Sequence, residues 1–246
     1  MNNTMAIGFD ADELCDRANA LALEFDFTVD NDVLPRLCVR ADKLVLLSDE
    51  FRPLFVDFSN QTWQKRRDAG KKQGLVRACK PNSGLRILDV TAGWGRDAAI
   101  LASFGATVLM LERQPIMAAL LRDALNRLAL DSSQPLLLEL LYTDARSYLQ
   151  DLPVADYPDV IYIDPMHPER QKSALVKKDM QVLQHLFGAD QDAHELIQLA
   201  ITRARRRVVV KWPQRLPSLL EPDLAIPGKT VRFDIYTSMA LPYPPP

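Results

Sequence analysis

Alternating strands and helices in the last two thirds of the chain constrain its fold more than any other feature. Runs rich in Val, Ile and Leu, typical of buried strands, occupy 86–90, 107–112, 136–142, 160–163 and 207–211. Apolar residues at helical spacing fill 94–104, 115–130 and 195–206 between those strands, and closing strands are expected within 230–237. This order predicts a mostly parallel sheet with helices on both faces.

The first 80 residues have a different character and predict a small α/β extension. Apolar residues at helical spacing indicate a helix over 11–25, and 36–48 and 54–58 indicate short strands, with a hairpin turn at Ala41-Asp42. We therefore expect an N-terminal extension over 1–80, a main domain over 81–240 and an extended Pro-rich tail over 241–246.

Composition narrows the possible environment and partners. The 246 residues are 48% hydrophobic, enough for a substantial core, and carry a net charge of −2, so any nucleic acid must bind local basic patches. Three cysteines without paired spacing indicate reduced thiols in the cytoplasm, and three histidines without a ligand pattern argue against a metal. The start lacks the features of a signal peptide, and no apolar run is long enough to span a membrane.

Two segments concentrate positive charge. The first, 59–80, has seven cations against one acid, and such a run is either a solvated helix face or a phosphate-contacting segment. The second follows residue 168 and is either a flexible polar loop or a contact to phosphates that flank a substrate. The candidate residues for binding nucleic-acid phosphates are Lys65, Arg66, Arg67, Lys71, Lys72, Arg170, Lys172, Lys177 and Lys178.

A glycine loop joins the first core strand to its helix, and its candidate cofactor-binding residues are Asp89, Gly93 and Gly95. Gly93 and Gly95 allow a tight turn and a close approach of the backbone to a ligand. The loop is only part of a dinucleotide-binding fingerprint, because Ala98 stands where a third glycine would be expected, and this argues against a nicotinamide-dependent oxidoreductase.

Acidic residues recur where later strands end. Glu112, followed by Arg113, lies about twenty residues beyond the glycine loop, where a carboxylate can bind ribose hydroxyls, although an exposed strand-end charge is the alternative. Asp144, followed by Ala145, either contacts an adenine amino group or caps the next helix, and the two roles remain equally open.

The run 159–168 contains the most informative motif. A buried strand delivers Asp164, and Pro165 then fixes a turn at the sheet edge where α/β proteins bind ligands. With His167, the motif Asp-Pro-Met-His-Pro resembles the (Asp/Asn)-Pro-Pro-aromatic motif of methyltransferases that modify exocyclic amines of bases. The simpler alternative is an Asp that caps a turn.

Several segments together resemble one bacterial family, the ribosomal RNA small subunit methyltransferase J family. They are Asp-Val-Thr-Ala-Gly-Trp-Gly-Arg-Asp, Met-Leu-Glu-Arg-Gln-Pro, Asp-Pro-Met-His-Pro, Gln-Lys-Ser-Ala-Leu-Val-Lys-Lys, Val-Val-Val-Lys-Trp-Pro and Arg-Phe-Asp-Ile-Tyr. The resemblance implies a Rossmann-like class I fold with a seven-stranded sheet, S-adenosylmethionine as cofactor, and methylation of guanine N2 near the 3′ end of 16S rRNA, free or in the small ribosomal subunit.

The resemblance also implies roles for individual residues. Cofactor contacts fall on Arg96, Asp97, Glu112, Arg113, Asp144, Ala145 and Asp164. This chain departs from the family in having Asp144-Ala145 where small hydroxyl residues are expected, and His167 where Phe is usual, although imidazole can also stack on a base.

The expected chemistry needs no nucleophilic side chain. Asp164 and the Pro165 carbonyl are placed to accept N–H bonds from the target amine, and His167 is placed beside them. Three other functions remain: methylation of another planar amine, in a DNA base or a protein glutamine; a non-catalytic RNA-binding module; and the oxidoreductase argued against above.

Overall fold

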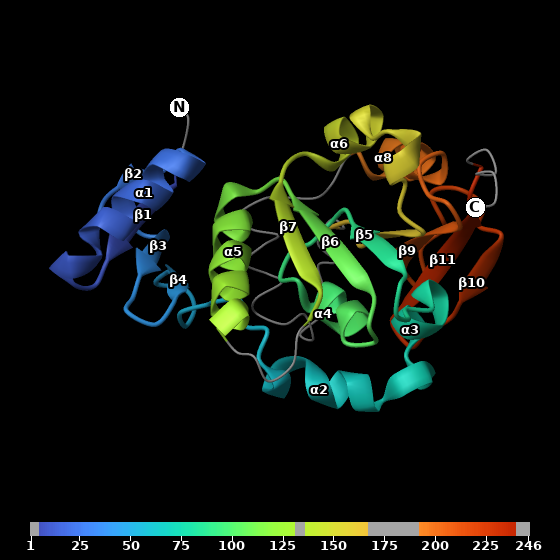
Figure 1. The fold of residues 1–246 in the computed structure, drawn as a ribbon, viewed down its shortest axis with the longest axis horizontal. Helices are drawn as coiled ribbons and strands as arrows, with labels where there is room; N and C mark the ends of the chain where they lie inside the picture. Colours follow the sequence, from blue (N-terminus) through green and yellow to red (C-terminus); the bar gives the residue numbers. More distant parts are fainter. Residues whose placement is uncertain (1–4, 131–135, 167–191, 240–246) are drawn as a thin grey trace.

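The structure is a computed structural model that describes residues 5–130, 136–166 and 192–239. Its larger sheet has seven strands in the order β10-β11-β9-β8-β5-β6-β7 (Figure 1). They are β5 (Arg86–Asp89), β6 (Thr107–Glu112), β7 (Leu138–Tyr142), β8 (Val160–Ile163), β9 (Arg207–Pro213), β10 (Leu224–Ile226) and β11 (Val231–Thr237). The strand β11 runs in the direction opposite to the other six strands, which are parallel to one another. The predicted mostly parallel, seven-stranded sheet is confirmed.

Helices cover both faces of this sheet. They are α2 (Asn60–Asp68), α3 (Gly74–Cys79), α4 (Arg96–Ala102), α5 (Pro115–Leu130), α6 (Ala145–Asp151) and α8 (Ala193–Ile201), with short 3-10 turns η2 (Gly70–Lys72) and η3 (Val154–Asp156). Alternate strand residues point to opposite faces, so Ile87 joins the core under α2 to α5 while Leu88 joins the core under α6 and α8. The near-continuous apolar runs of the sequence reflect this burial on both faces.

Strand order positions the functional site. The chain passes from β5 outward through β6 to β7, then returns to place β8 on the other side of β5. The crossover helices on the two sides diverge at this reversal, which leaves a crevice at the carboxyl ends of the central strands. The side chains that follow β5, β6 and β8 therefore meet at one edge of the sheet.

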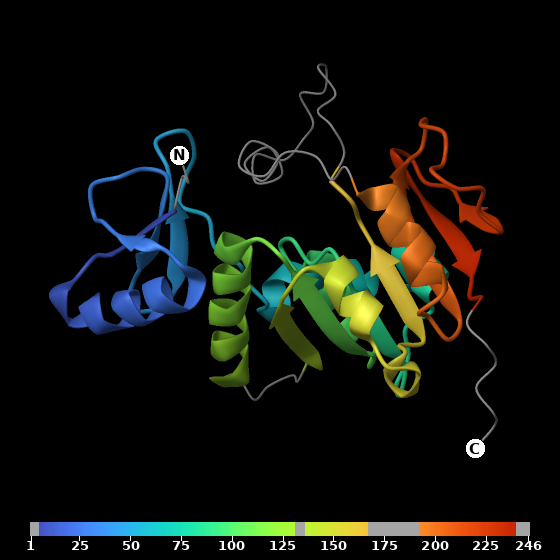
Figure 2. The same ribbon diagram turned by 90° about the horizontal axis from the view of Figure 1, so that it is seen from above.

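A second sheet of four strands, in the order β2-β1-β3-β4, forms near the N-terminus. Its elements are β1 (Ala6–Phe9), η1 (Asp12–Leu14), α1 (Cys15–Phe25), β2 (Thr28–Val29), β3 (Arg36–Val39) and β4 (Leu44–Leu47). The predicted hairpin between β3 and β4 is confirmed. In both ribbon views α5 lies between the two sheets, and it contacts α1 and β4 (Figures 1 and 2).

The basic segment lies on the larger sheet. The helix α2 contacts α4, and α3 contacts β11. Trp63 of α2 is 3% exposed and shares a core with residues of both sheets. The domain boundary that we expect at residue 80 stays a prediction.

Two sequence-based predictions of secondary structure are wrong, and the strand β10 was not predicted. Residues 54–58 form no strand, because only Leu54 pairs with β4, while the carbonyl groups of Val56 and Phe58 accept hydrogen bonds from side chains. The last core helix ends at Ile201, not at 206, because the next residues already pair with the segment that precedes β8. The edge strand β10 was missed, since three residues between prolines carry little periodic signal.

Within the described ranges, every helix is too short or too polar to cross a membrane.

Candidate active site

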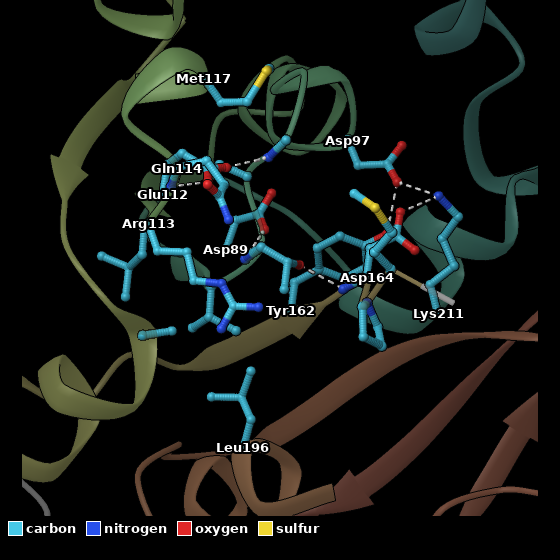
Figure 3. A pocket seen from close by; sticks show the side chains of 18 of the residues that line it. Asp89, Asp97, Glu112, Arg113, Gln114, Met117, Tyr162, Asp164, Leu196 and Lys211 are labelled. Carbon is cyan, nitrogen blue, oxygen red and sulfur yellow. Dashed lines mark hydrogen bonds and ion pairs between the residues drawn. The ribbon is translucent and has the colours of Figure 1, made fainter. Parts of the chain in front are cut away.

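A cavity of about 550 Å³ opens at the carboxyl ends of β5, β6, β8 and β9 (Figure 3). It brings together acids from three different strand ends, as the sequence predicts. The predicted site residues that line it are Arg66, Asp89, Gly93, Arg96, Asp97, Glu112, Arg113, Asp144, Ala145, Asp164 and Pro165. Glu112 and Asp164 therefore share one cavity.

Glu112 ends β6 and lies 8% exposed at one side of the cavity. Its two carboxylate oxygens accept hydrogen bonds from the backbone N–H groups of Gly93, at 3.0 Å, and Gln114, at 2.8 Å. Gly93 has a φ of +51°, a conformation that side chains disfavour, so glycine lets the loop present its N–H to Glu112. Burial raises the pKa of Glu112 to about 7 despite these hydrogen bonds.

Asp89 ends β5 and is 1% exposed. It accepts a hydrogen bond of 3.1 Å from the backbone N–H of Thr91. Burial raises the pKa of Asp89 to about 8; the Thr91 bond opposes this shift, and nearby carboxylates add to it. A buried acid with so high a pKa is a common feature of functional sites.

Asp97 and Asp164 occupy the other side of the cavity, and the Lys211 side chain reaches both of them from one side (Figure 3). The Lys211 Nζ atom is 2.6 Å from Oδ2 of Asp164 and 3.1 Å from Oδ2 of Asp97. The Tyr162 hydroxyl donates to the same Asp97 oxygen at 2.7 Å. Burial opposes ionisation of Asp97, but Lys211 and Arg66 outweigh it and hold the pKa of that carboxyl well below its usual range.

Two further contacts fix this side of the cavity. The Arg66 guanidinium, from the basic segment, donates to Oδ1 of Asp97 at 2.8 Å. The backbone N–H of Asp164 donates to the Thr91 hydroxyl at 2.7 Å. Asp164 is thus held through both its main chain and its side chain.

Asp144 has the helix-capping role that the sequence left open. Its side chain accepts a hydrogen bond of 3.0 Å from the backbone N–H of Ser147 in the first turn of α6. The predicted adenine contact of Asp144 and Ala145 stays a prediction. Arg113 forms an ion pair of 2.9 Å with Asp192, and both residues line the cavity.

Gly95 is not among the residues that line the cavity. Its φ is +66°, and a Cβ atom there would lie only 2.7 Å from Phe58 and 2.9 Å from Leu121. Close packing and the left-handed backbone therefore explain this glycine, while its predicted contact to the cofactor stays a prediction.

The predicted RNA-binding residues are only partly described. Arg66 reaches the cavity, Arg67 lies over the Trp63 ring, and Lys72 is exposed. Lys65 and Lys71 lie in α2 and η2. Outside the described residues fall His167, Arg170, Lys172, Lys177 and Lys178.

Tyr162 and Lys211 lie in the predicted strands 160–163 and 207–211 but are absent from the candidate site residues. Both had a usable signal. Tyr162 stands two residues before Asp164, and residues two apart in a strand share a face. Ile163 pairs with Val210, so the parallel register carries Lys211 to a position beside Asp164.

The fold and the cavity define a class of protein, an S-adenosylmethionine-dependent methyltransferase. The family model described as "Putative SAM-dependent methyltransferase" matches residues 20–238. The crystal structure of a SAM-dependent methyltransferase from Neisseria gonorrhoeae is similar with a TM-score of 0.74 and 27% identity, covering 96% of this chain and 97% of that chain. S-adenosylmethionine is the cofactor of this class.

Sequence relatives narrow the class to one family. Ribosomal RNA small subunit methyltransferase J of Legionella pneumophila (strain Corby) is 57% identical over 236 residues, which cover 96% of this chain and 97% of the relative. The protein of the same name from Coxiella burnetii (strain Dugway 5J108-111) is 48% identical over 192 residues, 75% of this chain and 74% of the relative. The chain belongs to the ribosomal RNA small subunit methyltransferase J family, and the predicted resemblance is confirmed.

The residues of the cavity fit the cofactor chemically. Glu112 and Asp89 are buried acceptors suited to hydroxyl and ammonium donors, and Met117 and Leu196 provide apolar wall for a flat ring. The volume lies within the range of small-molecule sites, roughly 300–1,000 Å³. Among the described residues no group of His, Cys, Asp or Glu is arranged to hold a metal ion.

Proposed function

We propose that this protein methylates the exocyclic N2 amine of a guanosine near the 3′ end of 16S rRNA, in the cytoplasm. The observation that carries the proposal is the shared cavity of Glu112 and Asp164, which joins a ribose-type acceptor to an amine-type acceptor. The relatives named ribosomal RNA small subunit methyltransferase J support 16S rRNA, free or within the small subunit, as the substrate.

On the cofactor side, Glu112 would bind the ribose hydroxyls, because its carboxylate is already fixed by two backbone N–H groups. Asp89, and the backbone of the glycine loop at Gly93, would bind the amino-acid portion. When bound, S-adenosylmethionine supplies an electrophilic methyl group. These three residues would orient the cofactor, and none of them forms a covalent bond with it.

On the amine side, Asp164 and the Pro165 carbonyl would accept the N–H bonds of the target nitrogen. The lone pair of an exocyclic amine is delocalised into the ring, so the nitrogen must become pyramidal as it reacts and gains positive charge. A fixed carboxylate stabilises that charge without reorganisation. Positioning of the two reactants supplies up to ~7–11 kcal/mol of the reduction in barrier.

The substrate base must leave its stack to reach this cavity. Arg66 lies where the basic segment meets the cavity, so cations of that segment are suited to bind phosphates beside a flipped nucleotide. His167 stays a candidate for stacking on the target base, and the cations that follow it stay candidates for contacts to the flanking phosphates.

The function is tested by mapping modified nucleotides in 16S rRNA from cells that lack the protein. Mass mapping should show the loss of one N2-methylguanosine, restored by the wild-type gene and not by Asp164→Ala. An unchanged set of rRNA methylations would contradict the proposal and favour another planar amine as the substrate. Binding of rRNA without any methyl transfer would favour the non-catalytic alternative.

A further inference from the structure

Lys211 is the cation of the amine side that the chemistry above leaves unused. It lies in β9 and lines the cavity, and its side chain is 26% exposed. Figure 3 shows it reaching from one side toward both Asp97 and Asp164, with Glu112 across the cavity. The ammonium group therefore contacts the motif carboxylate and a carboxylate from the start of α4 at once.

Lys211 remains charged in this setting. Burial opposes its charged form, but Asp164 and Asp97 outweigh this and raise its pKa above the usual range. It cannot serve as a base near neutral pH, and it is a fixed positive charge.

The partner carboxylate, Asp97, is itself held firmly. Its Oδ1 atom accepts from Arg66 and its Oδ2 atom accepts from Tyr162, in addition to Lys211. Asp97 is 14% exposed, so these hydrogen bonds are partly shielded from water. Lys211 thus connects Asp164 to an immobile anchor.

We propose that Lys211 is a positioning residue, whose ammonium group pins Asp164 to the Asp97 anchor so that the carboxylate is oriented before the amine arrives. This inference rests on the proposed function. It assigns Lys211 no contact with the reacting atoms. Because Arg66 belongs to the basic segment and shares the anchor, the same ion pairs link the RNA-facing helix α2 to the motif acid.

Kinetics of charge-removing and charge-keeping variants test this role. Lys211→Met should lower kcat for methylation of small subunits from cells lacking the protein by about 100-fold, the effect of a misplacement of about 1 Å. The KM for the cofactor should change little, because Lys211 lies away from Glu112. Lys211→Arg should recover part of kcat, methylammonium should partly rescue Lys211→Ala, and the exposed Lys229→Met is the matched control.

A second measurement needs no cofactor. Without Lys211, Asp97 loses a cation that lowers its pKa, so its buried carboxylate becomes costly to ionise. The thermal midpoint of cofactor-free Lys211→Met should therefore fall further below that of the wild type as pH rises from about 4 to about 7. The ionisable or charged groups that face this cluster are Arg66, Cys79, Asp89, Arg96, Glu112 and Tyr162.

The outcomes separate the inference from the proposed function. Normal kcat in Lys211→Met, with active wild-type enzyme, overturns the positioning role and leaves the function intact. A loss of kcat that methylammonium does not rescue, with the same drop in thermal midpoint at every pH, assigns Lys211 a packing role only and also overturns it. Inactive wild-type protein would refute the proposed function, while the pH-dependent midpoint would still report on the ion pairs.

Discussion

The two sides of the cavity hold their acids in opposite ways. On the cofactor side, Asp89 and Glu112 are buried and accept hydrogen bonds from backbone N–H groups in the described part of the chain, and burial raises their pKa values to about 8 and about 7. On the amine side, Asp97 and Asp164 pair with Lys211. One side keeps acceptor capacity for ligand donors, whereas the other is neutralised and fixed beforehand.

This difference suggests a division of labour. Burying an acid without a cation costs stability, and a ligand that donates hydrogen bonds recovers part of that cost on binding. An acid that must orient a weak nucleophile benefits instead from being held in place. The comparison predicts that mutations on the two sides affect different kinetic quantities.

The largest effect is expected from Asp164→Ala on the amine side. Loss of the carboxylate removes the group that stabilises charge on the amine nitrogen, so kcat should fall by about 10³-fold. Steady-state kinetics with small ribosomal subunits measure this, and the exposed Asp156→Ala is the control. Circular dichroism should report an intact fold. Near-normal turnover would remove Asp164 from the mechanism.

Glu112→Gln should affect binding instead. A neutral amide accepts weaker hydrogen bonds than a carboxylate and turns an N–H₂ group toward backbone donors, so the Kd of S-adenosylhomocysteine should rise about 10–100-fold. Calorimetric titration measures this change. Glu139→Gln, an exposed acid on the neighbouring β7, should leave Kd unaltered. Equal Kd values for the wild type and Glu112→Gln would contradict the proposal that the acids of the cofactor side act in cofactor binding.

The pH dependence of cofactor binding sharpens the comparison. With a pKa of about 7, Glu112 is mostly protonated at pH 6, and only the ionised form can accept two hydroxyl donors, so Kd should fall about tenfold from pH 6 to pH 8. In the cofactor-free protein the sign reverses. The folded state keeps a proton that the unfolded chain loses near pH 4.5, so this group's contribution to the free energy of unfolding decreases between pH 4.5 and about 7.

Titrations over this range should show both trends, and Glu112→Gln should reduce each of them to the part that Asp89, with a pKa raised to about 8, contributes. A Kd that stays constant from pH 6 to pH 8 would mean that Glu112 is already ionised at pH 6 in the cofactor-free protein, which would contradict this prediction.

The smallest effect per residue is expected in the basic segment. Replacing Lys65, Arg67 and Lys72 with Ala should reduce the slope of log K against log salt for RNA by about 0.7–0.9 for each phosphate that a cation no longer neutralises. Arg66 is left in place because it anchors Asp97. Fluorescence anisotropy at several salt concentrations measures the slope, with Lys43→Ala plus Lys229→Ala as the control. An unaltered slope would contradict a role of the basic segment in RNA binding and would favour the cations that follow the Asp-Pro-Met-His-Pro motif.

Much of the fold was predictable because strands that are buried on both faces of the sheet have near-continuous apolar sequences. The strands β6 and β8 and the helix α5 have the predicted bounds, since each is bounded by a charged residue, a proline or a break in the apolar pattern. The prediction of a strand over 54–58 was wrong because an apolar segment that packs on a core can have the sequence pattern of a strand without pairing with another strand.

Asp89, Glu112 and Asp164 were predictable for the same reason, because each ends or follows a buried strand. The ion pairs were not. The Asp97 contacts with Arg66, 31 residues away in sequence, and with Lys211, 114 residues away, depend on how α2 and β9 are placed. The sequence shows neither that placement nor that Lys211 will contact both Asp97 and Asp164.

The most direct test is a crystal structure with S-adenosylhomocysteine. The account predicts ribose hydroxyls within hydrogen-bond distance of Glu112, the sulfur atom on the Asp164 side, and Lys211 still bound to Asp97 and Asp164. A ribose bound away from Glu112, or a ligand outside this cavity, would contradict it.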